Sequence, residues 1–264
     1  MDLQLKHPLA FVPTMGALHA GHQSLIKIAE SHAPNVLVSV FVNPLQFENP
    51  DDLAKYPRDL DGDALKAESA GATFVWSPTV EEIYPEQPTI ISSGEIGNLF
   101  EGVRRFGHFD GVLTVVKRLF DLTDPQFAVF GEKDFQQLFL IKKMVKDLAL
   151  PIEIIQAPII READGLAMSS RNIRLTSDSR TISLALSRAL KAAAEEVDID
   201  SARRVLLEVL KSEPGFTIDY AEIIDESDFS IATNQTESPR AIIAGWINDL
   251  RLIDNMQMNC GDKR

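Results

Sequence analysis

The stretch that decides the fold is Phe11-Val-Pro-Thr-Met-Gly-Ala-Leu-His-Ala-Gly-His-Gln-Ser-Leu25. It begins at the end of an apolar run, passes through a turn with two glycines, and ends where helical spacing begins. Gly16 and Gly21 can adopt backbone angles closed to other residues, and they let a ligand approach the main chain. The N-terminus of a helix carries unpaired N–H groups and a partial positive charge. A strand, a glycine turn and a helix N-terminus together make a binding site for phosphate.

Two histidines lie in this turn. His19 and His22 are three residues apart, so both rings can face one spot near the helix N-terminus if His22 opens the helix. Imidazoles add hydrogen-bond donors close to neutral pH. The alternative is an ordinary strand–turn–helix unit with two surface histidines, because a motif as short as His-x-Gly-His also occurs by chance.

The composition is that of a soluble globular protein. The 264 residues suffice for one large domain or two ordinary ones, and 45% are hydrophobic and 25% charged. The net charge of −13 argues against general nucleic-acid binding but leaves small anionic substrates open. We expect no signal peptide and no membrane span, and the one cysteine, Cys260, has no partner for an intrachain disulfide. These features predict a cytoplasmic protein.

Apolar strands alternate with helical periods over the first 160 residues. Strands are expected at residues 8–13, 35–42, 72–76, 125–130 and 151–156, and helices at 21–31, within 51–71, at 111–121 and at 135–148. The run at 35–42 has almost no polar breaks, which is typical of a central parallel strand covered on both faces. The alternation predicts a doubly wound α/β domain.

The pattern changes after residue 160. A polar loop at 161–172 precedes two expected helices, at 176–197 and 201–210, and three strand-like runs, at 216–224, 240–246 and 250–253. The last two runs are joined by Ile247-Asn-Asp249, which fits a hairpin turn. We therefore expect one domain over residues 1–160 and a smaller α+β domain over residues 161–264.

Four polar loops are expected at one edge of the sheet, where open α/β sheets bind ligands. They are the histidine turn, residues 43–46, residues 131–134, and residues 168–171. The second of these loops opens the segment 43–50, whose two prolines stop helix and strand. Each loop alone has an ordinary explanation: a solvated glutamine, a polar strand-to-helix cap, or a loop with an N-cap. Their order along the chain and their placement at strand ends favour a common site.

Six longer motifs run through the chain: Pro13-Thr-Met-Gly-Ala-Leu-His-Ala-Gly-His22, Phe41-Val-Asn-Pro-Leu-Gln-Phe47, Tyr56-Pro-Arg58, Gly131-Glu-Lys-Asp-Phe-Gln-Gln137, Arg161-Glu-Ala-Asp-Gly-Leu-Ala-Met-Ser-Ser-Arg-Asn172 and Arg251-Leu-Ile-Asp-Asn255. In this combination the chain resembles the pantothenate synthetase, or pantoate–β-alanine ligase, family over nearly its whole length. The resemblance implies a Rossmann-like doubly wound parallel sheet of the nucleotidyltransferase superfamily, a smaller C-terminal lid domain, and a homodimer. It also implies the reaction: ATP with Mg²⁺ activates (R)-pantoate as a pantoyl adenylate, and β-alanine then displaces AMP to give pantothenate.

The resemblance assigns roles to individual residues. The residues implied to bind ATP are Met15, Gly16, Ala17, Leu18, His19, Ala20, Gly21, His22, Gly131, Glu132, Lys133, Asp134, Ile160, Met168, Ser169, Ser170 and Arg171. Catalysis is assigned to His22, as proton donor, with His19 and Lys133. Gln46, Gln137 and Asn43 are implied to bind pantoate, Gln46 also β-alanine, and no protein group is assigned to Mg²⁺. The residue types fit, because lysine is a compact charge suited to phosphates and glutamine pairs with hydroxyls and carboxylates.

The chain departs from the family pattern at a few positions. Ala20 stands where an acidic residue is frequent, Glu48 where glycine is usual, and Phe135 where tyrosine is common; the segment before the first strand is short. None of these changes removes a group that the chemistry needs.

Two other classes of function stay open at this point. A transferase that moves a nucleotidyl group onto a phosphorylated substrate would share the histidines and the Ser-Ser-Arg loop. It gives no reason for residues 43–46 or for Gln137. A catalytically silent binding module descended from a tRNA synthetase would suit a basic chain, which this one is not.

Overall fold

The computed structural model describes residues 4–47, 53–54 and 56–260. The chain divides into two compact units, Met1–Pro158 and Ile159–Arg264. In the described part of the chain, no helix combines the length and the apolar character needed to cross a membrane. Glu48, one of the departures from the family pattern, lies outside the described residues.

The first unit is built on a five-stranded parallel sheet with the strand order β3-β2-β1-β4-β5. Its strands are β1 (Leu9–Thr14), β2 (Asn35–Val40), β3 (Phe74–Trp76), β4 (Phe127–Gly131) and β5 (Glu153–Ala157). The chain runs from β1 outward to β3 and then returns to β4 on the other side of β1. Ligands of this fold bind at the carboxyl ends of the strands where the order reverses, here at β1 and β4. The predicted doubly wound parallel sheet is confirmed.

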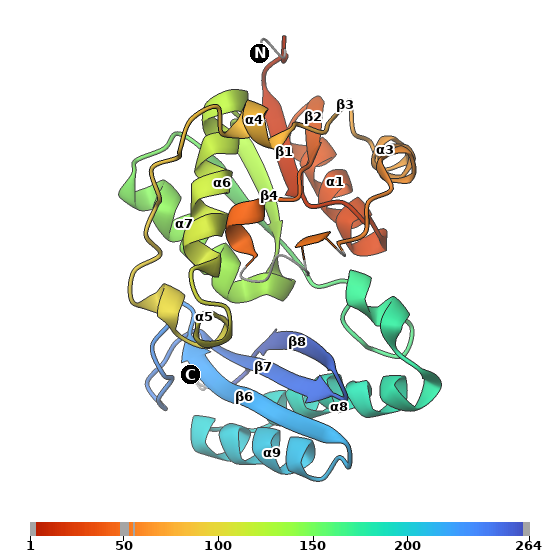
Figure 1. The fold of residues 1–264 in the computed structure, drawn as a ribbon. Coiled ribbons are helices and arrows are strands. Elements are labelled where there is room, and N and C mark those ends of the chain that lie inside the picture. Colours follow the sequence, from red (N-terminus) through yellow and green to blue (C-terminus); the bar gives the residue numbers. More distant parts are fainter. Residues whose placement is uncertain (1–3, 48–52, 55, 261–264) are drawn as a thin grey trace. The chain divides into compact units, whose positions relative to one another are not determined.

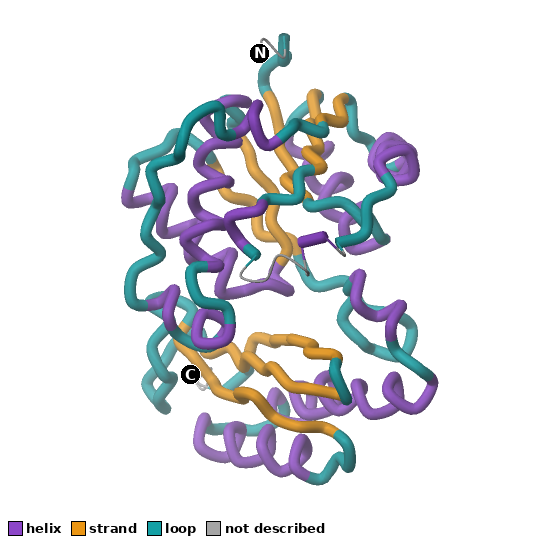
Figure 2. The backbone as a smooth tube through the Cα atoms, in the orientation of Figure 1, coloured by secondary structure: helices purple, strands orange, loops and turns teal. Residues whose placement is uncertain are grey.

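Helices cover both faces of this sheet, as Figure 1 shows, with α1 and α3 on one side and α6 and α7 on the other. The four helices are α1 (Ala20–His32), α3 (Leu60–Ser69), α6 (His108–Thr123) and α7 (Phe135–Asp147). Between β3 and α6 the chain is mostly loop and carries only α4 (Val80–Ile83), η2 (Ile96–Asn98) and α5 (Glu101–Arg104) among its described elements (Figure 2).

Alternating side chains of β1 explain why both faces are covered. Val12 belongs to the buried cluster that includes Ile26 and Ala29 of α1. Phe11 points to the opposite face and contacts Phe120 of α6 edge to face, with the ring centroids 6.4 Å apart. Successive residues of a strand face opposite sides of a sheet, so each face of β1 anchors a different helix layer.

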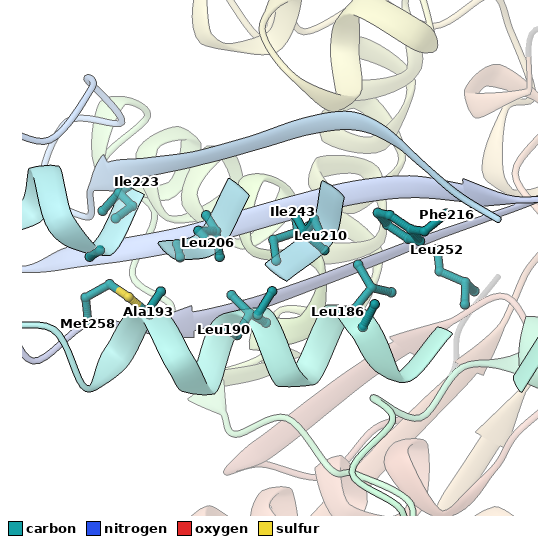
Figure 3. Packing of buried hydrophobic residues seen from close by; sticks show 14 of the residues in the cluster. Leu186, Leu190, Ala193, Leu206, Leu210, Phe216, Ile223, Ile243, Leu252 and Met258 are labelled. Atoms are coloured by element: carbon teal, nitrogen blue, oxygen red, sulfur yellow. The ribbon is translucent and has the colours of Figure 1, made fainter. Parts of the chain in front are cut away.

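The second unit packs two helices against a three-stranded antiparallel sheet. The sheet order is β6-β7-β8, formed by β6 (Phe216–Asp225), β7 (Pro239–Ile247) and β8 (Leu250–Gln257). The helices are α8 (Ser177–Ala194) and α9 (Ile199–Lys211). Leu186, Leu190 and Ala193 project from one face of α8 into the shared core (Figure 3), as residues four and three apart on a helix do.

The predicted hairpin between β7 and β8 is confirmed. Ile247 pairs with Leu250, and the turn residue Asn248 has φ of +53°, a left-handed conformation that asparagine tolerates. β8 extends beyond the predicted run at 250–253 because its last residues pair with β7 through Arg240 and Gln257. Likewise α6 starts at His108 rather than at 111, directly after Gly107, whose φ of +71° ends the preceding turn.

Candidate active site

Two histidines cap helix α1. His19 is the N-cap residue, and its Nδ1 accepts the N–H of Gly21 at 3.1 Å. Nδ1 of His22 accepts the N–H of His19 at 3.3 Å, which completes a reciprocal capping box. The helix therefore begins at Ala20, one residue before the predicted start at Gly21, and His22 is its third residue. The two rings nevertheless lie together, with centroids 4.1 Å apart.

The cap fixes the tautomers of both rings. A ring nitrogen that accepts an N–H bond carries no proton, so in the neutral form each ring has its proton on Nε2. Burial and, to a smaller extent, the neighbouring His19 lower the pKa of His22 to about 3. Burial disfavours the charged form of the ring, so His22 is neutral near pH 7. At neutral pH this residue offers a neutral Nε2–H donor.

A buried carboxylate holds the turn that precedes α1. Asp63 of α3 is 1% exposed, and its two oxygens accept the N–H groups of Ala17 at 2.8 Å and Leu18 at 2.7 Å. A Cβ at Gly16, where φ is +90°, would lie 2.9 Å from Oδ2 of Asp63 and 3.2 Å from Val40. Ala17 also has a positive φ, of 52°, which is unfavourable for a residue with a side chain. The turn therefore depends on glycine at position 16 and on the carboxylate of Asp63, which is distant in the sequence, at Ala17.

Asp63→Asn is expected to loosen this turn. An amide has one accepting oxygen, so one of the two backbone N–H groups loses its partner, at a cost of about 1–3 kcal/mol. We expect a lower free energy of unfolding in urea and faster amide hydrogen exchange at Ala17 or Leu18. Asp61→Asn, at an exposed position in the same helix turn, is the matched control. Equal exchange rates in both variants would contradict a bracing role for Asp63.

The side chain of Asn43 holds the loop after β2 through hydrogen bonds. Asn43 is 1% exposed, and its Oδ1 accepts the N–H of Leu45 at 3.3 Å and the hydroxyl of Tyr84 at 3.0 Å. Its Nδ2 donates to Oε1 of Gln46 at 3.0 Å and to the carbonyl of Gly111 at 3.0 Å. An asparagine side chain has two donors and two acceptor sites, so the protein itself uses all four.

Gln46 ends the short helix η1 (Pro44–Gln46) and is 8% exposed. Its Oε1 accepts from Asn43, and its Nε2 donates to the sulfur of Met15 at 3.3 Å. A thioether is a weak acceptor, so a stronger one can replace it at little cost. This contact joins the loop after β2 to the turn after β1, as expected for adjacent parallel strands that end at the same edge.

The third loop follows β4. Gly131 leads into η3 (Glu132–Asp134), where Nζ of Lys133 lies 3.7 Å from Oδ1 of Asp134. The charge of Asp134 raises the pKa of His22 and that of Lys133 lowers it, although burial outweighs both. The charged side chains of η3 therefore lie close enough to His22 to affect its pKa, so the loops after β1 and β4 are near each other.

Two consecutive glutamines of α7 have different surroundings. Gln136 is buried; its Nε2 donates to the carbonyls of Ile96 at 2.7 Å and Leu99 at 2.9 Å. The side chain of Gln137 is half-buried and makes no hydrogen bond within the described residues. Its amide is available to a ligand, whereas Gln136 braces the loop before α5.

The fourth predicted loop belongs to the second unit. The N–H of Met168 donates to the carbonyl of Ile160 at 2.9 Å, and Ser169 caps η4 (Ser170–Arg174) by accepting the N–H of Arg171 at 3.3 Å. Arg161 donates to both oxygens of the buried Asp254, at 2.7 and 2.9 Å, so the motifs at 161–172 and 251–255 form one structural element. That this loop joins the other three stays a prediction.

Sequence reasoning missed several residues of the site. The sequence pattern could have indicated Asp63, since it is an acidic residue at a core position of a helical period. The pattern could also have indicated His108, because it opens a helix between two glycines, at 107 and 111. No sequence pattern could have indicated Tyr84, because a single tyrosine in a proline-rich loop has no local pattern.

The parallel sheet reverses its strand order at β1 and β4. Two histidines cap the helix that follows the glycine turn, and a lysine follows the fourth strand. These features define a nucleotide-binding protein of the Rossmann-like class. The family model described as Pantoate-beta-alanine ligase matches residues 2–257. Pantothenate synthetase of Acidothermus cellulolyticus is 46% identical over 271 residues, which cover 98% of this chain and 88% of that protein. Pantoate–β-alanine ligase of Schizosaccharomyces pombe is 46% identical over 259 residues, with 94% and 90% covered.

Two solved structures of this family are also similar to this chain. Pantothenate synthetase from Thermus thermophilus has a TM-score of 0.90 and 43% identity, with 95% of this chain and 93% of that chain covered. The pantoate-beta-alanine ligase from Francisella tularensis, complexed with Beta-gamma ATP and Beta-alanine, has a TM-score of 0.74 and 36% identity, with 94% and 88% covered. This chain belongs to the pantoate–β-alanine ligase family, whose reaction joins pantoate to β-alanine.

Proposed function

We propose that the chain carries out this ligation in two steps that use ATP. The carboxylate of (R)-pantoate attacks the α-phosphorus of ATP, and pyrophosphate leaves. The amine of β-alanine then attacks the carboxyl carbon of the pantoyl adenylate, and AMP leaves. The observation that carries the proposal is the contact between Gln46 and Met15, at 3.3 Å. It sets the candidate pantoate loop beside the candidate phosphate turn, and an attack on phosphorus needs that proximity.

Charge that develops on the phosphate oxygens is stabilised in this proposal by preorganised donors. His19 and His22 supply Nε2–H groups, and Lys133 supplies a positive charge. His22 acts as a hydrogen-bond donor, since burial holds its pKa at about 3. The backbone of residues 15–21 and of residues 131–134 surrounds the phosphates, as glycine turns at helix N-termini do.

Pantoate is bound in this proposal by Gln46 and Gln137. Both are neutral donor–acceptors, and Gln137 has no side-chain hydrogen bond within the described residues. Asn43 contributes through Gln46, because its own four hydrogen-bonding positions are taken. Gln46 also contacts the incoming β-alanine.

Mg²⁺ enters the proposal as the partner of the triphosphate, where it would neutralise negative charge. The described residues hold no group of three or more His, Cys, Asp or Glu side chains that could bind a metal ion alone. Proteins commonly bind Mg²⁺ through substrate phosphates with one or two carboxylates. The resemblance further supports a homodimer in the cytoplasm and a lid role for the second unit, with Ile160 and residues 168–171 on the nucleotide.

The test of this proposal is isotope exchange. With ATP, Mg²⁺ and pantoate but no β-alanine, we expect labelled pyrophosphate to appear in ATP, because the adenylate forms reversibly on its own. Omitting pantoate should abolish the exchange. Exchange that strictly requires β-alanine would overturn the two-step mechanism, and a full reaction that yields ADP instead of AMP would overturn the site of attack.

A further inference from the structure

The first turn of α6 packs directly on the backbone of η1. A Cβ at Gly111 would lie 2.3 Å from the carbonyl oxygen of Leu45 and 2.9 Å from the nitrogen of Gln46, so no side chain fits there. The carbonyl of Gly111 also accepts the Nδ2–H of Asn43 at 3.0 Å. The helix thus meets the loop that carries Gln46 without any intervening side chain.

His108 adds a directed bond to this contact. It is 6% exposed, and its Nδ1 lies 3.0 Å from the carbonyl oxygen of Gln46. A carbonyl only accepts, so Nδ1 carries the proton. Burial and, to a smaller extent, the charge of Arg105 lower the pKa of His108 to about 4. The ring is therefore neutral at neutral pH and has one tautomer, in which Nδ1–H points at Gln46.

η1 needs a brace of this kind. Its own backbone bonds are long, at 3.4 Å from the Gln46 nitrogen to the Asn43 carbonyl and 3.2 Å from the Phe47 nitrogen to the Pro44 carbonyl. Short 3₁₀ turns have poor hydrogen-bond geometry. Asn43 and Met15 hold the side chain of Gln46, and His108 holds its main chain.

We propose that His108 is a positioning residue for pantoate, because its Nδ1–H fixes the Gln46 carbonyl and so sets the direction of the Gln46 amide. The inference rests on the proposed role of Gln46 in pantoate binding. His108 acts only through Gln46. A residue that merely fills the core would serve all substrates equally, whereas a brace on Gln46 affects pantoate and β-alanine, which Gln46 contacts, and leaves ATP unaffected.

Three substitutions at residue 108 separate these roles. Asparagine places an amide nitrogen near the position of Nδ1, so His108→Asn keeps the donor. Glutamine places its amide one bond farther out, so His108→Gln is polar but misplaced. His108→Leu keeps apolar bulk and has no donor. If packing alone mattered, leucine would be the best replacement, and asparagine would have no advantage over glutamine.

The experiment is steady-state kinetics on the full chain with a melting curve for each variant. We expect His108→Leu and His108→Gln to raise KM for pantoate by about tenfold, in line with the loss of one buried hydrogen bond. The ATP KM should stay within about twofold, since no contact to the phosphate turn changes. His108→Asn should recover most of the pantoate affinity. Equal pantoate KM in the Asn and Gln variants, or an unchanged KM in the Leu variant, would overturn the proposal.

A double variant shows whether the effect passes through Gln46. In a Gln46→Leu background, His108→Leu should add little to the pantoate KM, because the group that it positions is gone. Full additivity would overturn the inference. If Gln46→Leu alone leaves the pantoate KM unchanged, the proposed pocket is itself wrong and the inference falls with it. If Gln46→Leu impairs pantoate binding and His108→Leu does not, only the inference fails.

Discussion

His22→Asn is expected to lower kcat by about a hundredfold or more while the protein keeps its fold, as loss of a transition-state donor does. Asparagine can still present an oxygen near the position of Nδ1, which accepts the N–H of His19 in the helix cap. The Nε2–H donor has no counterpart in the shorter side chain. The measurement is kcat beside a melting curve, and the melting temperature should change little. A variant that unfolds or keeps near-normal turnover would contradict the proposed role.

Two comparisons sharpen this result. Lys133→Ala should lose a similar factor, since it removes the other donor to the phosphates, and Lys27→Ala, at an exposed position of α1, should not. The loss in His22→Asn should be the same at pH 6 and at pH 8. A pKa of about 3 means that the wild-type ring is neutral throughout this range. A loss that grows at low pH would indicate an imidazolium acid in place of a neutral donor.

The fold was predictable because its signals are local. The apolar run at 35–42 and the helical spacing at 135–148 each indicate one element, and their alternation indicates a parallel sheet. The histidine cap was predictable for the same reason, since residues three apart share a helix turn. Only the first helical residue was misplaced, because the cap depends on which ring nitrogen meets which backbone N–H.

The parts of the site that escaped prediction depend on long-range contacts. Asp63 lies 46 residues from Ala17, and His108 lies 62 residues from Gln46, yet each pair is hydrogen-bonded. No periodicity connects such partners. The protonation state of His22 could not be predicted for a related reason, because its pKa depends on burial by elements that are remote in sequence. Asn43 was expected to contact substrate, and only the folded loop reveals that its amide is saturated.

Gln46→Leu is expected to lower kcat/KM for pantoate by about a hundredfold. Leucine keeps similar bulk and removes only the amide. Hydroxyl or carboxylate groups of bound pantoate would then be buried without partners, at roughly 1–3 kcal/mol for each group, and two such groups account for the expected factor. ATP binding, measured by calorimetry without pantoate, should change little, because the bond that links the Gln46 amide to the phosphate turn is the weak contact with the sulfur of Met15.

The controls for this variant follow from the same network. The Nδ2 of Asn43 loses one of its two acceptors in Gln46→Leu, so a modest fall in melting temperature is expected and must be measured beside the kinetics. Gln87→Leu makes the same substitution at an exposed loop position and should leave both substrates unaffected. If ATP binding collapses while pantoate kinetics hold, Gln46 serves the nucleotide and the pantoate pocket lies elsewhere.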